Sequence, residues 1–137
     1  MKKMGDMLLQ RKAFSEIVMG NTAIVRAMVE AGTRVVSSYP GSPTPEIAAA
    51  IGSIPAADRP FYFEFSTNEK VAFDEGMGAA LGGIRTLVTM KHVGLNVAAD
   101  PFMVFPYAGT NAGFVVLVAD DPGMYSSQNE QDSRYFA

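Results

Sequence analysis

The 137-residue chain has no cysteine and only one histidine. The absence of cysteine excludes disulfides, thiolate nucleophiles and cysteine-ligated clusters within this chain. A single histidine, with no carboxylate cluster at ligand spacing, gives no support for a metal site. The net charge is also small, because 11 basic and 14 acidic residues leave only -3. We therefore find no electrostatic reason to expect nucleic acid or an anionic membrane surface as a partner.

Long apolar runs are missing too, and no segment approaches the length needed to span a membrane. Lys2 and Lys3 could open a signal peptide, but charged residues from Asp6 to Glu16 interrupt any apolar stretch that would complete it. The length is that of one domain at most, with enough residues to bury a core. We expect a soluble, cytoplasmic protein.

Short apolar runs alternate with helical patterns along the chain, which predicts an α/β fold. The expected strands are 34–38, 61–65, 86–90 and 114–119. Because they are apolar throughout, they should be buried on both faces, in an open and mostly parallel sheet with helices on both faces. After the last strand, residues 126–137 are polar and then turn apolar, as if another element were beginning.

The expected helices have recognisable ends. Asn21 can cap the first helix and Gly32 can end it. Thr44 can cap the second, with Pro45 in its first turn. Asn68 or Thr67 can cap the third, which Gly82 and Gly83 close, and a fourth is expected over 97–107.

Three loops follow three of the strands, so they should meet at one edge of the sheet, where parallel sheets bind ligands. They are Ser66–Glu69, Asp120–Gly123 and the segment from Thr89 to Pro101, Thr-Met-Lys-His-Val-Gly-Leu-Asn-Val-Ala-Ala-Asp-Pro.

Glu69 has two interpretations. A carboxylate near a helix N-terminus is favoured by about 0.3–1 kcal/mol, which explains many such residues without a function. Alternatively, a carboxyl group partly shielded by Phe61, Phe63 and Phe65 could hydrogen-bond a heterocyclic nitrogen of a ligand.

Other candidates also have two interpretations. The turn from Pro40 to Pro43 could only connect a strand to a helix, or could place the Ser42 hydroxyl beside a ligand. His92 could be an ordinary surface residue of a loop or could face a substrate. Gly76 and its neighbouring glycines fall within a helix, so they fit close helix-to-sheet packing better than a dinucleotide fingerprint.

Four segments together resemble a known family. Tyr39–Pro43, Ser66–Ala72, Thr89–Pro101 and Ala119–Arg134 are similar to the N-terminal part of the alpha subunit of indolepyruvate ferredoxin oxidoreductase, in the thiamin-diphosphate-dependent 2-oxoacid:ferredoxin oxidoreductase family. The likeness runs from about Gly20 to the end of the chain. It implies a pyrimidine-binding domain over 20–137, incomplete at its C-terminus, after an N-terminal extension over 1–19.

The resemblance also implies roles for individual residues. The glutamate matching Glu69 would be catalytic, bonding N1′ of the aminopyrimidine ring. Pro40, Gly41, Ser42 and Gly94 would bind the cofactor with it, and Ser42 and His92 would contact substrate.

The implied reaction is the oxidative decarboxylation of indolepyruvate and other arylpyruvates to acyl-CoA, with ferredoxin reduced. The implied partners are a diphosphate-binding domain of the same or a second subunit, a beta subunit, coenzyme A and ferredoxin. Mg²⁺ and [4Fe-4S] clusters would come from regions or chains not present here, so we expect the isolated chain to be inactive. The alternatives are the pyrimidine-binding chain of a non-oxidative 2-oxoacid decarboxylase, and a non-catalytic interaction or regulatory domain that kept the fold.

Overall fold

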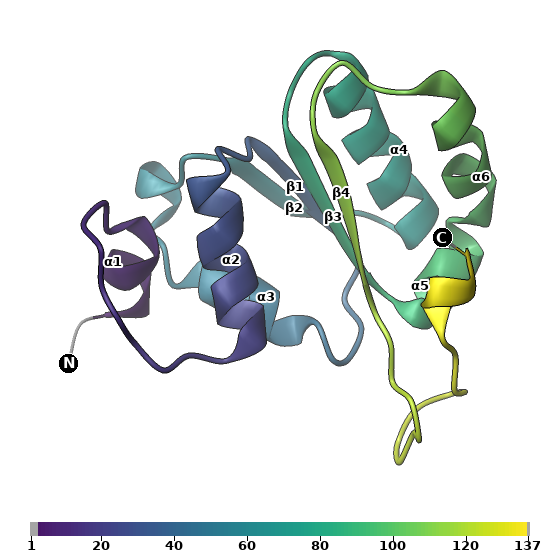
Figure 1. The fold of residues 1–137 in the computed structure, drawn as a ribbon, viewed down its shortest axis with the longest axis horizontal. Coiled ribbons are helices and arrows are strands. Elements are labelled where there is room, and N and C mark those ends of the chain that lie inside the picture. The colour runs from purple at the N-terminus through teal and green to yellow at the C-terminus, as the bar shows by residue number, and fades with distance from the viewer. Residues whose placement is uncertain (1–2, 137) are drawn as a thin grey trace.

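A computed structural model describes residues 3–136, and its centre is a sheet of parallel strands (Figure 1). The strands are β1 (Val35–Ser38), β2 (Tyr62–Phe65), β3 (Thr86–Lys91) and β4 (Phe114–Ala119), in the order β2-β1-β3-β4. Ser38 is in register with Phe65 on one side and Thr89 on the other, and Lys91 pairs with Ala119. All strands therefore end at the same edge, as the sequence predicts.

Helices cover both faces of the sheet. One face carries α1 (Met4–Leu9), α2 (Gly20–Glu30) and α3 (Pro45–Gly52), and the other carries α4 (Glu69–Leu81), α5 (His92–Val97) and α6 (Ala99–Ala108). Two short 3₁₀ turns, η1 (Ala56–Asp58) and η2 (Ser133–Phe136), complete the described elements. A hydrophobic cluster lies on each face, and β3 contributes Leu87 to one and Val88 and Met90 to the other.

The starts of the helices agree only partly with the predicted caps. Asn68 is a true cap, because its side chain accepts a hydrogen bond from the Val71 backbone N–H at 2.9 Å. The prediction for Asn21 is wrong: α2 begins at Gly20 with Met19 at the cap position, and the Asn21 amide instead donates to the Pro43 carbonyl at 2.7 Å. Thr44 does precede α3, but its hydroxyl donates to the Gly41 carbonyl rather than capping a backbone N–H.

The segment expected to be a loop followed by one helix over 97–107 is in fact two helices, α5 and α6, with Ala98 between them. Pro101 lies in the first turn of α6, where a missing N–H costs nothing because those groups have no partner within a helix. Gly94 and Leu95 of α5 are buried, so packing against the rest of the fold favours helix at this position.

Residues before Gly20, predicted to be an extension, contribute to the core. Leu8 of α1 is fully buried in the cluster beneath α2 and α3. The Arg26 guanidinium donates to the carbonyls of Met7 and Leu8 at 3.0 and 3.1 Å, which fixes α1 to α2. Lys2 and the terminal Ala137 lie outside the described residues. None of the helices within 3–136 has the length and apolarity needed to cross a bilayer.

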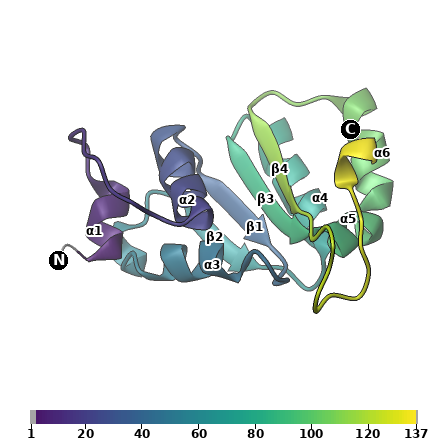
Figure 2. The same ribbon diagram turned by 60° about the horizontal axis from the view of Figure 1, so that its bottom comes forward.

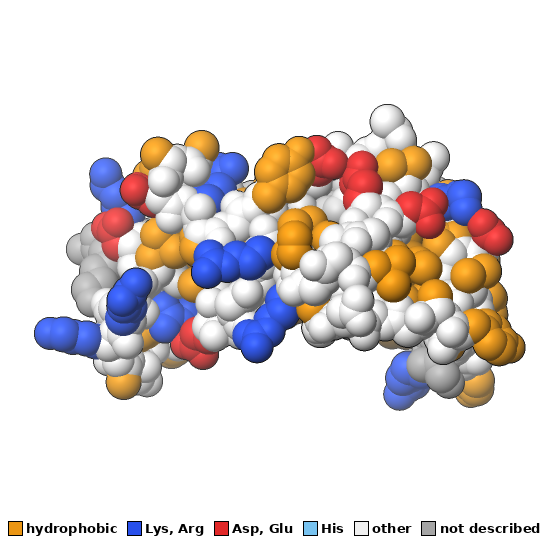
Figure 3. Space-filling view, turned by 90° about the horizontal axis from the view of Figure 1, so that it is seen from above, with side chains coloured by type: hydrophobic (Ala, Val, Ile, Leu, Met, Phe, Trp, Pro, Cys, Tyr) orange, Lys and Arg blue, Asp and Glu red, His pale blue; other side chains and the backbone are white. Residues whose placement is uncertain are grey.

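The packing of α4 on the sheet explains Gly76 but not the neighbouring glycines, because a Cβ at Gly78 or Gly83 would meet nothing within 4 Å. A Cβ on Gly76 would lie 2.4 Å from Cγ2 of Val88, so only glycine allows this approach, as the sequence predicts. Figure 3 shows the edge at which the strands begin: most of the Lys and Arg side chains lie over the half made by α1 and α2, and apolar side chains gather over the half made by α4 and α6.

Candidate functional site

A pocket of about 290 Å³ lies at the edge of the sheet where the strands end. In Figure 2 the ribbon is turned so that this edge comes forward. The pocket opens beside β1 and β3, where the chain leaves neighbouring strands toward opposite sides of the sheet, and such switch points are where open α/β sheets bind ligands. The lining residues are Tyr39, Pro40, Gly41, Ser42, Glu69, Lys91, Val93, Ser126 and Gln128. The pocket thus brings together four of the predicted site residues, from the turn after β1 and the start of α4.

A larger cavity, of about 570 Å³, lies elsewhere, beside Arg34 and Asp58 at the start of β1 and in η1. It contains none of the predicted site residues. Its volume is the only argument for it, whereas the smaller pocket has the position that sheet topology favours.

Glu69 is the first residue of α4, and its side chain is only 8% exposed. Its side chain forms no hydrogen bond or ion pair with any other residue in the described range 3–136. The carboxylate is packed against Gly94 of α5, since a Cβ there would lie 2.5 Å from Cγ and 2.6 Å from Oε1 of Glu69. A nearly buried carboxylate without a partner in the protein is a group prepared to bond a ligand.

The predicted aromatic shielding of Glu69 is wrong. Phe61 and Phe63 pack into the cluster on the face that α2 and α3 cover, whereas α4 covers the opposite face. Phe65 contacts Phe63 edge to face at 5.2 Å and is about half exposed. Strand alternation directs these side chains away from α4, so the Gly94 backbone, not an aromatic wall, covers the carboxylate.

Lys91, at the end of β3, is a charged residue of the pocket that was not predicted from the sequence. Lys91 is 8% exposed, and a Cβ added to Gly41 would lie 2.9 Å from the Cβ of Lys91. The ammonium donates to the Ser127 hydroxyl, and Oε1 of Gln128 lies 3.5 Å away. The only signal in the sequence is a lysine at the end of an otherwise buried strand.

His92 is neither on the surface nor in the pocket. It begins α5 and is fully buried, and its Nε2 lies 3.1 Å from the carbonyl oxygen and 3.0 Å from Oδ1 of Asn129. Its Nδ1 has no partner among the described residues. This placement gives no support to a substrate contact from His92 and suits a residue that holds neighbouring segments together.

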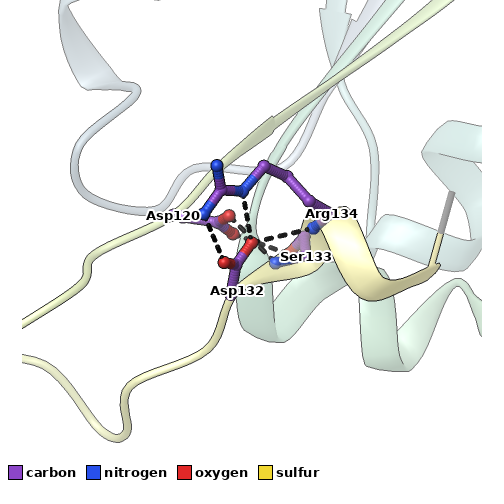
Figure 4. A network of polar contacts seen from close by, with 4 residues as sticks. All are labelled: Asp120, Asp132, Ser133 and Arg134. Carbon is purple, nitrogen blue, oxygen red and sulfur yellow. Dashed lines mark hydrogen bonds and ion pairs between the residues drawn. The ribbon is translucent and has the colours of Figure 1, made fainter.

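The polar segment after β4 folds back and is fixed by contacts among Asp120, Asp132, Ser133 and Arg134 (Figure 4). Asp120 accepts hydrogen bonds from the Ser133 backbone N–H at 2.9 Å and from its hydroxyl at 2.6 Å. Beside it, Arg134 pairs with Asp132 at 2.6 Å, and the hydrogen bond from Arg134 lowers the pKa of the Asp132 carboxyl. Closing the segment in this way places Ser126 and Gln128 at the pocket and Asn129 against His92.

Comparison with known proteins gives a consistent result, although no family model matches the chain. The chain is 52% identical over 96% of its length to indolepyruvate oxidoreductase subunit IorA of Methanothermobacter thermautotrophicus. It is 54% identical over 88% of its length to the same subunit of Methanothermobacter marburgensis, and 48% identical over its whole length to that of Pyrococcus abyssi. The chain spans only 19–21% of these relatives.

A solved 2-oxoglutarate:ferredoxin oxidoreductase from Magnetococcus marinus, with 2-oxoglutarate, coenzyme A and succinyl-CoA bound, has the same fold. The TM-score is 0.71 at 17% identity, over 88% of this chain and 21% of that one. The architecture is thus that of an α/β domain found within 2-oxoacid:ferredoxin oxidoreductases. The similarity in sequence is narrower and confirms the predicted resemblance: the chain is related to the oxidoreductase subunit IorA.

Proposed function

We propose that this chain is the pyrimidine-binding part of a thiamin-diphosphate-dependent oxidoreductase that acts on indolepyruvate and other arylpyruvates, forming acyl-CoA and reducing ferredoxin. The observation that carries the proposal is Glu69, a nearly buried carboxylate at the pocket with no partner among residues 3–136. The relatives of the chain are named for indolepyruvate, which supports the proposed class of substrate.

The residues of the pocket fit the cofactor's aminopyrimidine ring. A planar heterocycle needs a hydrogen-bond partner for its ring nitrogen, and Glu69 can offer one oxygen. Gly94 leaves room for the carboxyl group, and the turn at Pro40, Gly41 and Ser42 forms the neighbouring wall. When bound, thiamin diphosphate supplies a nucleophilic thiazolium carbon that reacts with the carbonyl of a 2-oxo acid.

In this proposal Glu69 holds a proton at the pyrimidine N1′ and so acts as a general acid and base for the ring. We also assign a substrate contact to the Ser42 hydroxyl, which belongs to a lining residue of the same pocket. The described residues contain no group of three or more side chains able to hold a metal ion. We therefore assign the diphosphate and Mg²⁺ to a domain of the same or a second subunit, and clusters, ferredoxin and coenzyme A to the remaining parts of the enzyme, with a beta subunit. On its own the chain should be inactive.

The test is Glu69→Gln in the holoenzyme. The amide keeps the shape of the side chain but cannot exchange the proton, so C2–H/D exchange of bound thiamin diphosphate should slow about 100-fold or more, the usual range for a lost acid–base group. Exchange is followed by NMR of the released cofactor. An undiminished exchange rate would refute the role of Glu69.

A matched control removes the same charge from the first turn of another helix. Glu46, in α3, is exposed and bonds Asn21 outside the pocket. Glu46→Gln should leave exchange unchanged. The two alternatives give different results: an aldehyde product in place of acyl-CoA would indicate a non-oxidative decarboxylase, and failure of the holoenzyme to bind thiamin diphosphate would indicate a non-catalytic domain.

A further inference from the structure

Resting on the proposed function, we propose that the Lys91 ammonium is the binding point for the carboxylate of the 2-oxo acid substrate. The proposal concerns the second charged side chain of the pocket, opposite in sign to Glu69. Among the lining residues, Lys91 is the one that carries a positive charge.

The surroundings of Lys91 leave its charge uncompensated. The side chain is 8% exposed, and the oxygens around its ammonium belong to the neutral side chains of Ser127 and Gln128. Within residues 3–136, no carboxylate lies within the 4.0 Å of an ion pair. Withdrawing an ammonium from water without a counter-charge is costly, so an anion that enters the pocket gains a strong, charge-assisted hydrogen bond.

The pocket that Lys91 shares with Glu69 favours the substrate as the anion that binds there. Glu69 and Lys91 line the same pocket, yet they do not pair with each other. Because both residues line one small pocket, a ligand group bound at the ammonium lies close to a ring bound at Glu69. A 2-oxo acid carries its carboxylate next to the reacting carbonyl, so an ion pair with Lys91 fixes the orientation of that carbonyl.

The aliphatic part of the Lys91 side chain is contacted by the protein, as its ammonium is. Gly41 allows the turn after β1 to lie directly on the lysine Cβ, and the segment after β4 supplies Ser127 and Gln128 from the other side. Contacts on both sides keep the ammonium at one place, which reduces the entropy lost when a ligand binds.

The experiment compares two unreactive ligands of the same shape, indole-3-acetate and indole-3-acetamide, by calorimetric titration of the holoenzyme. We expect the wild type to bind the carboxylate at least about tenfold more tightly than the amide. Lys91→Met should bring the ratio to about 1, and Lys91→Arg should keep most of the preference. Lys70→Met is the matched control, because Lys70 is an exposed lysine outside the pocket, and it should leave the ratio unchanged.

Three results would overturn the proposal. One is a wild-type enzyme that does not prefer the carboxylate, which needs no variant. Another is a Lys91→Met enzyme that keeps the preference. The last is a Lys91→Met enzyme that has lost its thiamin diphosphate, since Lys91 would then hold the cofactor. The readouts separate this test from that of the proposed function: the role of Lys91 is read from the ratio of two ligand affinities without turnover, whereas the role of Glu69 is read from C2–H/D exchange in Glu69→Gln.

Discussion

At the scale of single residues, the pocket depends on two glycines that bring backbone close to charged side chains. Gly94 covers the carboxyl group of Glu69, and Gly41 covers the stem of Lys91. Both charged residues are mostly buried, and both still line the pocket. A glycine at either position is needed for the approach itself, and not for an unusual backbone conformation, because neither has a positive φ.

Gly94→Ala tests this arrangement. The new Cβ would lie 2.5 Å from Cγ of Glu69, so the carboxyl group must move away from its position. We expect C2–H/D exchange in the holoenzyme to fall about 100-fold, because a catalytic group displaced by about 1 Å commonly costs that much.

Gly78→Ala is the control for the backbone effect of adding a methyl group to a helix. Nothing lies within 4 Å of a Cβ at Gly78 in α4, so this variant should keep normal exchange and gain up to about 1 kcal/mol of stability. Normal exchange in Gly94→Ala would mean that Glu69 does not need its observed position.

Single residues also show where sequence analysis succeeds and where it fails. Glu69 was predicted to lie at the site because its place after a strand and at a helix start is a local pattern. Lys91 was missed, and the surface interpretation of His92 is wrong, because both residues contact the segment after β4, more than thirty residues along the chain. No local pattern records such a contact.

At the scale of elements, α4 is fixed to the sheet by a polar contact as well as by apolar packing. The hydroxyls of Ser37 in β1 and Ser66 after β2 both donate to Oε2 of Glu75, at 2.7 and 2.5 Å. Burial alone would raise the pKa of Glu75, but these hydrogen bonds, with a further contribution from Glu64, hold it below its ordinary value of 4.5. The carboxylate therefore stabilises the fold when it is ionised.

This contact gives a pH-dependent stability. Because the folded-state pKa is depressed, the stabilisation is fully present above about pH 4.5 and is lost as pH falls through the lower folded value. At pH 7, Glu75→Gln should lower the free energy of unfolding of the purified chain by about 1–2 kcal/mol, measured in urea. The difference from wild type should shrink as the pH falls below 4.5.

Asp74→Asn is the neighbouring control. Asp74 is half exposed, with a distant contact of 3.8 Å to Lys70, so its replacement should change stability by less than about 0.5 kcal/mol. A Glu75→Gln deficit that stays constant down to acidic pH would show that the charge of Glu75 does not stabilise the fold.

The elements themselves were largely predictable, since strands and helices follow apolar periodicity. The errors lie where tertiary contacts compete with local preference. Asparagine is a residue type that favours the cap position, but the side-chain amide of Asn21 donates instead to the Pro43 carbonyl and to Glu46 of α3. The segment from His92 to Val97 suggests a loop because it directly follows a strand, yet it forms a helix in which Gly94 and Leu95 are buried.

At the scale of the whole molecule, one sheet joins two hydrophobic clusters. The cluster beneath α1, α2 and α3 contains Val36 and Leu87, and the cluster beneath α4 and α6 contains Val88 and Met90. Since β3 supplies side chains to both, its backbone cannot leave one cluster without disturbing the other. The sequence predicted the parallel sheet but not the division into two clusters. A short apolar strand indicates that both faces of the sheet are buried, but it does not indicate which helices cover each face.

Unfolding should therefore be a single transition, even when the damage is confined to one face. Phe73 is fully buried and contacts Phe102, Phe105 and Phe114 edge to face at centroid distances of 6.2, 6.0 and 5.2 Å. Phe73→Ala should cost about 3–5 kcal/mol, out of a total that is commonly 5–15 kcal/mol for a domain. Ile51→Ala, in the opposite cluster, should cost about 2–5 kcal/mol.

Methyl NMR in a urea titration provides one reporter on each face, Val25 for the first cluster and Met90 for the second. In Phe73→Ala and in Ile51→Ala, the native signals of both reporters should disappear at the same urea concentration, as two-state unfolding requires. Native Val25 signals that persist in Phe73→Ala after those of Met90 have gone would mean that the two faces unfold separately. The shared strand β3 would then transmit too little of the packing energy to couple them.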